Sequence, residues 1–148
     1  MHKHILIATD GSDLATKAVE SGLDLARQIG ARVTILTASE DWSVLDMAQR
    51  AREGASNPIE DYEALARANA EAILARCSDM AQTAGVVSDV VYARESHPAE
   101  AIVENAKSRG CDLIVMASHG RRGIDRLLLG SQTSRVLALT NLPVLIYR

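Results

Sequence analysis

Residues 111–136 read CDLIVMASHGRRGIDRLLLGSQTSRV, and the succession of patterns in this stretch indicates the fold class. The short apolar run at 112–117 predicts a strand that is buried on both faces. A loop with three glycines and two arginines follows it, and Ser131 is the predicted N-cap of a helix that extends to about Leu139. A buried strand that leads through a loop into a helix is the building unit of a parallel sheet.

The same alternation of strand and helix patterns runs through the whole chain. Apolar, β-rich runs predict strands at 4–9, 32–38, 86–93, 112–117 and 143–147. Helical patterns separate them, at about 15–29, 57–83, 98–108 and 131–139. Right-handed crossovers then predict an α/β fold with a doubly wound, five-stranded parallel sheet of order 3-2-1-4-5 and helices on both faces. We expect residues 1–148 to form a single domain, and residues 39–56 fit either a mobile flap or a partial helix.

Composition narrows the class of protein. Of the 148 residues, 47% are apolar and 24% are charged, which is typical of a soluble globular chain. A net charge of -3 and an aromatic content of 3% argue against a nucleic-acid partner. No apolar run approaches the length that a bilayer requires, and the amino terminus lacks a signal-peptide pattern, so we expect a cytoplasmic protein with no membrane partner. Cys77 and Cys111 lie far apart and are expected to be free thiols.

The predicted strand order places two loops beside each other at the carboxyl edge of the sheet. In doubly wound sheets, ligands bind at this edge, where the winding reverses. Here the loops are 9–12 and 117–131. The glycines of the second loop let the backbone approach a ligand closely, and the start of the following helix suits an anion. Because aromatic residues are scarce, a bound purine is expected to lie against aliphatic side chains and backbone.

Charged side chains in these two loops complete a predicted phosphate site. Arg121 and Arg122 could neutralise a polyphosphate, and Asp10 could face its metal ion or a ribose hydroxyl. The sequence lacks the GxxxxGK[ST], GxGxxG and GxSxG motifs, which argues against a P-loop hydrolase, a Rossmann dinucleotide site and a hydrolase elbow.

The second loop resembles the nucleotide loop of the universal stress protein family, whose pattern is G-x2-G-x9-G-[ST]. The segment 117–120 (ASHG) is followed by nine residues and then by Gly130 and Ser131, with Ala117 in place of the first glycine. The opening 5–19 (ILIATDGSDLATKAV) and the ending 141–146 (NLPVLI) also resemble that family. An alanine at 117 costs little if its φ is negative. At a positive φ it costs about 1 kcal/mol, or roughly a fivefold loss in affinity.

The resemblance implies an α/β fold, frequent dimers and, in one branch, bound ATP. By matching position, Ala8, Thr9 and Asp10 would lie near adenine, ribose and metal, and Ala38 would meet adenine through its backbone. Met116 and Ala117 would line the ribose side. The phosphates would be held by Gly120, Gly130, Ser131 and Gln132.

The leading hypothesis is therefore a cytoplasmic regulatory protein that binds ATP or ADP with Mg²⁺ and whose ligand state is read by a protein partner or by a dimer. A homodimer is expected through the edge strand Pro143 to Tyr147. One alternative is a slow ATPase or phosphotransferase, although no dedicated acid–base set is visible, so at most weak ATP hydrolysis is expected. Another alternative is a nucleotide-free dimeric interaction module.

Overall fold

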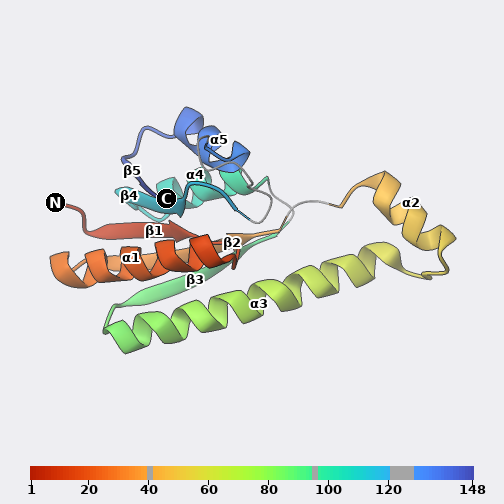
Figure 1. The fold of residues 1–148 in the computed structure, drawn as a ribbon, viewed down its shortest axis with the longest axis horizontal. Coiled ribbons are helices and arrows are strands. Elements are labelled where there is room, and N and C mark those ends of the chain that lie inside the picture. Colours follow the sequence, from red (N-terminus) through yellow and green to blue (C-terminus); the bar gives the residue numbers. More distant parts are fainter. Residues whose placement is uncertain (40–41, 95–96, 121–128) are drawn as a thin grey trace.

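The five strands form one parallel sheet of order β3-β2-β1-β4-β5, as the sequence predicts. The computed structural model describes residues 1–39, 42–94, 97–120 and 129–148 (Figure 1). The strands are β1 (His4–Ala8), β2 (Arg32–Ala38), β3 (Ser88–Ala93), β4 (Leu113–Ala117) and β5 (Val144–Tyr147). The third strand begins two residues later than the predicted 86–93.

Strand β1 is the centre of the sheet. It pairs in parallel with β2 on one side and with β4 on the other, with Ile5 opposite Val33 and Leu113. All five of its residues are buried. Burial on both faces explains why the strand reads as a continuous apolar run and does not alternate apolar with polar residues.

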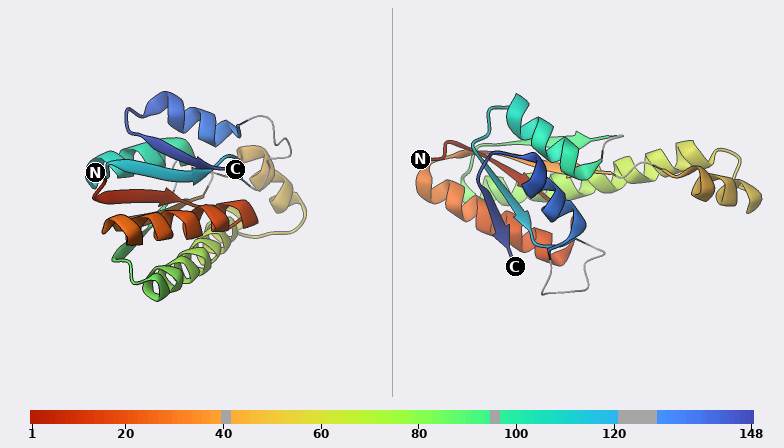
Figure 2. Two further views of the ribbon diagram at one scale, coloured as in Figure 1. Left: turned by 60° about the vertical axis from the view of Figure 1, so that its left-hand side comes forward. Right: turned by 90° about the horizontal axis from the view of Figure 1, so that it is seen from above.

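Two helices cover each face of the sheet (Figure 2). On one face, α1 (Asp13–Ile29) and α3 (Pro58–Ala84) pack on Ile5 and Ile7 of β1. On the other face, α4 (Pro98–Ser108) and α5 (Ser131–Leu139) pack on Leu6. Alternate residues of β1 thus belong to two different cores, which is the side-chain period of a strand.

Capping residues fix the helix that leaves β1. Ser12 precedes α1, and its hydroxyl accepts a hydrogen bond from the Ala15 N–H at 3.3 Å. Gly30 ends α1 with a φ of 70°, a left-handed conformation that favours glycine.

The predicted cap of α5 is wrong. Ser131 is the first residue of that helix, and the N-cap position is occupied by Gly130, which has no side chain to cap it. The N–H groups of the first turn of a helix have no partner within it. In α5 the Gly130 N–H donates to the Ser118 carbonyl and the Ser134 N–H donates to the Gly130 carbonyl, which, within the described residues, leaves the N–H groups of residues 131–133 available to other groups.

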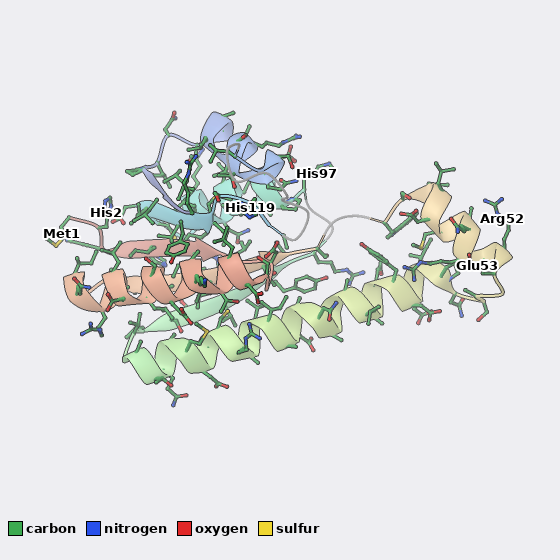
Figure 3. All side chains as sticks on the ribbon, viewed as in Figure 1. Met1, His2, Arg52, Glu53, His97 and His119 are labelled. Carbon is green, nitrogen blue, oxygen red and sulfur yellow. The ribbon has the colours of Figure 1, made fainter. Side chains whose placement is uncertain are left out.

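Helix α2 (Val44–Arg52) and the amino-terminal part of α3 form an arm that projects beyond the sheet (Figure 1). Within 39–56 the structure thus shows a partial helix, and residues 40 and 41 lie outside the described residues. Met47 of α2 is buried, and the Arg50 guanidinium lies 5.7 Å from the centre of the Tyr62 ring of α3. Arg52 and Glu53 mark the tip of the arm (Figure 3).

Both cysteines are free and buried, as their separation in the sequence predicts. Burial raises the pKa of the Cys77 thiol and of the Cys111 thiol, so neither is a reactive thiolate at neutral pH. Within the described parts of the chain, no helix is both long and apolar enough to cross a bilayer.

His4 is a buried titratable group at the amino end of β1, at the opposite end of the strands from the two loops. It is 8% exposed, and its Nε2 lies 2.8 Å from the Thr34 Oγ1. Burial, and then the charge of Arg32, lower the pKa of His4 below 6.5. A hydrogen bond with the Arg109 backbone and the charges of Asp112 and Asp89 oppose that shift without cancelling it.

We predict that His4 makes the protein less stable in mild acid. The folded-state pKa is depressed, so the unfolded chain binds the proton more readily; the contribution is fully present above about pH 6.5 and is lost as the pH falls below it. Urea unfolding between pH 8 and pH 5 should show the free energy of unfolding falling by at most about 1.4 kcal/mol per pH unit from this group. His4→Gln should flatten that slope, and an unchanged slope would contradict the assignment.

Candidate functional site

A cavity of about 510 Å³ opens at the carboxyl ends of the strands. This volume lies within the range of small-molecule sites. The structure brings together around it ten of the twelve residues predicted for the site: Ala8, Thr9, Asp10, Ala38, Met116, Ala117, Gly120, Gly130, Ser131 and Gln132. The other two, Arg121 and Arg122, lie outside the described residues. The predicted crevice between the loops after β1 and β4 is therefore present.

Asp10 is held by its own turn. Its Oδ1 accepts a hydrogen bond from the Ser12 N–H at 2.9 Å, and the Thr9 hydroxyl accepts one from the Gly11 N–H at 3.2 Å. Gly11 has a φ of 78°, which an L-residue rarely adopts. This turn fixes the position of Asp10, whose side chain lies in the wall of the cavity.

Gly120 lies against that carboxylate. A Cβ built on Gly120 would collide with the Asp10 Oδ2. The loops after β1 and β4 therefore meet at this point, and a side chain at position 120 would displace the Asp10 carboxylate.

The loop between β4 and α5, residues 117–131, is called the glycine loop. Its two ends are held together by one backbone hydrogen bond and by one side-chain hydroxyl. The Gly130 N–H donates to the Ser118 carbonyl at 2.7 Å, and a Cβ on Gly130 would lie 3.1 Å from the His119 Cα. Thr133, 2% exposed, donates its hydroxyl proton toward the carbonyls of Ala117 (2.9 Å) and Ser118 (3.1 Å). Sequence reasoning missed Thr133, because its role depends on how α5 returns to the end of β4.

The first turn of α5 lies in the wall of the cavity. Ser131 and Thr133 line it, and the Gly130 cap contributes no side chain. The positive end of the helix dipole therefore suits an anion here.

The side chain of Gln132 contacts α4. Its Oε1 accepts a hydrogen bond from the Ala99 N–H at the start of that helix, at 3.2 Å. His119 also lines the cavity, at the end of β4 (Figure 3), and its Nδ1 lies 3.1 Å from the Ser118 hydroxyl.

One face of α3 forms a wall that sequence reasoning missed. The cavity is lined by Tyr62, Ala66, Asn69, Ala70 and Ile73. Their spacing is that of one helix face, and the small residues within it were the available signal. Tyr62 also corrects the expectation that only aliphatic side chains and backbone would surround a purine.

A metal ion would find few protein ligands here. Among the described residues, no group of three or more His, Cys, Asp or Glu side chains is placed to hold a metal. Within the described cavity wall, the carboxylate is that of Asp10. This fits Mg²⁺, which is commonly held by one or two carboxylates together with substrate phosphates and water.

Ala117 is compatible with the site. It is the last residue of β4 and pairs with Tyr147, so its backbone is extended, a conformation open to any residue. Its side chain is buried against Ala15, Ala18 and Tyr147. The methyl group therefore contributes packing at little backbone cost.

We predict that Ala117→Gly lowers stability and leaves ligand affinity unimproved. It removes a buried methyl and places glycine in a strand, so the free energy of unfolding should fall by about 1–2 kcal/mol. Urea unfolding and calorimetric titration with ATP would measure both effects. A fivefold gain in affinity would show that the methyl obstructs the site.

The chain resembles known proteins along its whole length. Residues 1–148 match the model of the Universal stress protein family. Universal stress protein YxiE of Bacillus subtilis (strain 168) is 30% identical over 149 residues, covering all of both chains. The solved structure of hypothetical protein MJ0577 superposes with a TM-score of 0.79 at 24% identity, covering 99% of this chain and 96% of that one.

A second solved structure is a universal stress protein in complex with cAMP, with a TM-score of 0.65 at 26% identity over 99% of this chain and 97% of the other. The family match and the similarity to YxiE both extend from the first strand to the last. This chain belongs to the universal stress protein family.

Proposed function

We propose that this protein binds an adenine nucleotide, ATP or ADP with Mg²⁺, and acts as a cytoplasmic regulatory protein in a stress response. The observation that carries the proposal is the cavity in which Asp10, the glycine loop and the start of α5 face one space. The relative solved with cAMP supports an adenine nucleotide as the class of ligand.

The phosphates would lie against the glycine loop. The backbone at Gly120, the close approach that Gly130 allows, the Ser131 hydroxyl and the N–H groups of residues 131–133 would receive them. Asp10 would hold Mg²⁺ together with phosphate oxygens, and Arg121 and Arg122 would add positive charge.

The nucleoside would lie on the other side of the cavity. The ribose side would be lined by Ala8, Thr9, Met116 and Ala117, and the backbone of Ala38 would meet the base.

The polar groups of the cavity wall favour nucleotide binding without efficient turnover. The Oδ1 of Asp10 already accepts the Ser12 N–H, and the nearby His119 is paired with Ser118. Asp10 is assigned to the metal ion in this proposal, and Nε2 is the nitrogen of the His119 ring that its contact with Ser118 leaves to take a proton, whereas activation of water needs a base positioned to reach it. We therefore propose at most weak ATP hydrolysis.

A homodimer through Pro143–Tyr147 is proposed as the unit that presents the ligand state to a partner protein. Strand β5 is the last strand of the sheet order. Leu145 of β5 is 36% exposed, and Leu137 and Leu139 of the preceding helix are 40% and 48% exposed. Apolar side chains beside a sheet edge favour pairing with a second copy.

We predict that calorimetric titration with Mg²⁺ and ATP gives a dissociation constant below about 1 mM, and that Gly120→Ala weakens binding at least about tenfold. The added methyl displaces the Asp10 carboxylate, which removes both the metal ligand and the close approach of the loop. Acid release from freshly purified protein, analysed by mass spectrometry, should identify a co-purifying adenine nucleotide.

Gly54→Ala is the matched control for that substitution. Gly54 lies near the tip of the arm with a φ of 100°, and no described atom lies near its missing Cβ. Alanine there should strain the backbone and lower stability without changing affinity. Wild-type protein that binds no nucleotide at millimolar concentration would overturn the proposal.

We predict that the protein sediments as a dimer at micromolar concentration and that Leu145→Arg produces monomers. The substitution places a charge at the proposed pairing edge, where it would be buried without a partner. Sedimentation velocity would measure both species. A wild-type monomer would contradict the dimer proposal and leave the nucleotide proposal untouched.

A further inference from the structure

The cavity has two chemically different ends. At one end lie the glycine loop and the start of α5, beyond β4. From there the cavity extends across β1 to Thr37, Ala38 and Ser39, at the end of β2, and to the inner face of α3. If phosphates occupy the first end, the base of a bound nucleotide lies at the second.

The base end has an open slot on α3. Ala66 and Ala70 are small, and Tyr62 and Ile73 lie about one turn before and after them on the same helix face. A flat ring that lies across the two alanines would have apolar surface on both sides. Asn69 lies within this face, so its amide reaches the same space as the ring edge.

Asn69 offers hydrogen-bonding groups that the structure leaves available. It is exposed at the open cavity, and its amide makes no hydrogen bond with any residue in the described ranges. The other amide side chain in the lining, Gln132, already accepts the Ala99 N–H. At the end of β2, the Ser39 hydroxyl is already paired with the Tyr92 hydroxyl, at 2.9 Å. Thr37 is only 3% exposed, so its side chain is buried. Asn69 is thus the side chain at the base end that is best able to form hydrogen bonds with the edge of a bound ring.

We propose that Asn69 selects adenine over 6-oxopurines by hydrogen bonding to the edge that carries the 6-amino group. This inference rests on the proposed nucleotide binding. The amide oxygen accepts from the 6-amino group while the amide N–H donates to N7, a pairing that asparagine makes with adenine. Guanine and hypoxanthine present two acceptors on this edge, O6 and N7, so the amide can pair with only one of them whichever way it is turned.

The test compares nucleotides that differ only at position 6. Calorimetric titration would measure ATP, inosine triphosphate and purine riboside triphosphate, which carry an amino group, a carbonyl oxygen and hydrogen at that position. Wild-type protein should prefer ATP to either analogue by about fivefold to a hundredfold. In Asn69→Ala that preference should fall to within about twofold, because the contact that distinguishes ATP is lost.

Gln82→Ala is the matched control. Gln82 is an exposed amide on the same helix, outside the cavity. Both variants replace an exposed amide side chain of α3 with alanine, so Gln82→Ala should retain the wild-type preference. Both should fold, because alanine favours an exposed helix position.

The possible outcomes distinguish the role of Asn69 from nucleotide binding itself. A wild-type protein that binds ATP, together with an Asn69→Ala variant that keeps the full preference for ATP, would overturn the role of Asn69 and locate the selection in the backbone. Equal wild-type affinity for all three nucleotides would overturn it while nucleotide binding stands. Absence of binding to any of them would overturn both proposals.

Discussion

The pairing of β1 with β4 sets the geometry of both the sheet and the crevice. The chain leaves β1 for α1 on one face of the sheet and leaves β4 for α5 on the other. The two loops must therefore separate, and a crevice opens between them at the carboxyl edge. They meet again where Gly120 lies against the Asp10 carboxylate, and both residues line the cavity.

Backbone groups supply much of the chemistry at the β4 side of this crevice. Gly130 and Thr133 tie the neck of the loop to the carbonyl oxygens at the end of β4, so α5 begins at a fixed place with a glycine as its cap. Because the two ends of the loop are tied together, less conformational entropy is lost when an anion binds. The proposed phosphate site therefore needs few dedicated side chains.

Helix α3 belongs both to the cavity and to the arm. Its inner face lines the base end of the cavity, and ion pairs and ring contacts tie the same helix to neighbouring elements. Glu63 pairs with Arg94 at 2.9 Å, and the Arg67 guanidinium lies 5.8 Å from the centre of the Tyr92 ring on β3. Exposed pairs of this kind contribute modest stability. Their value here is to orient a 27-residue helix whose outer end has no sheet beneath it.

Sequence patterns were sufficient to predict the strand order, most element bounds and the two loops of the crevice, because hydrophobic period and glycine position are local signals. They were not sufficient to predict which groups remain available in the cavity, since that depends on packing between distant segments. In the folded chain the cap of α5 is Gly130, the side chain of Gln132 is engaged with α4, and Tyr62 and Asn69 line the cavity. The last two positions depend on how α3 packs against segments distant in the sequence, and the packing of a long helix across a sheet edge has no signature in local periodicity.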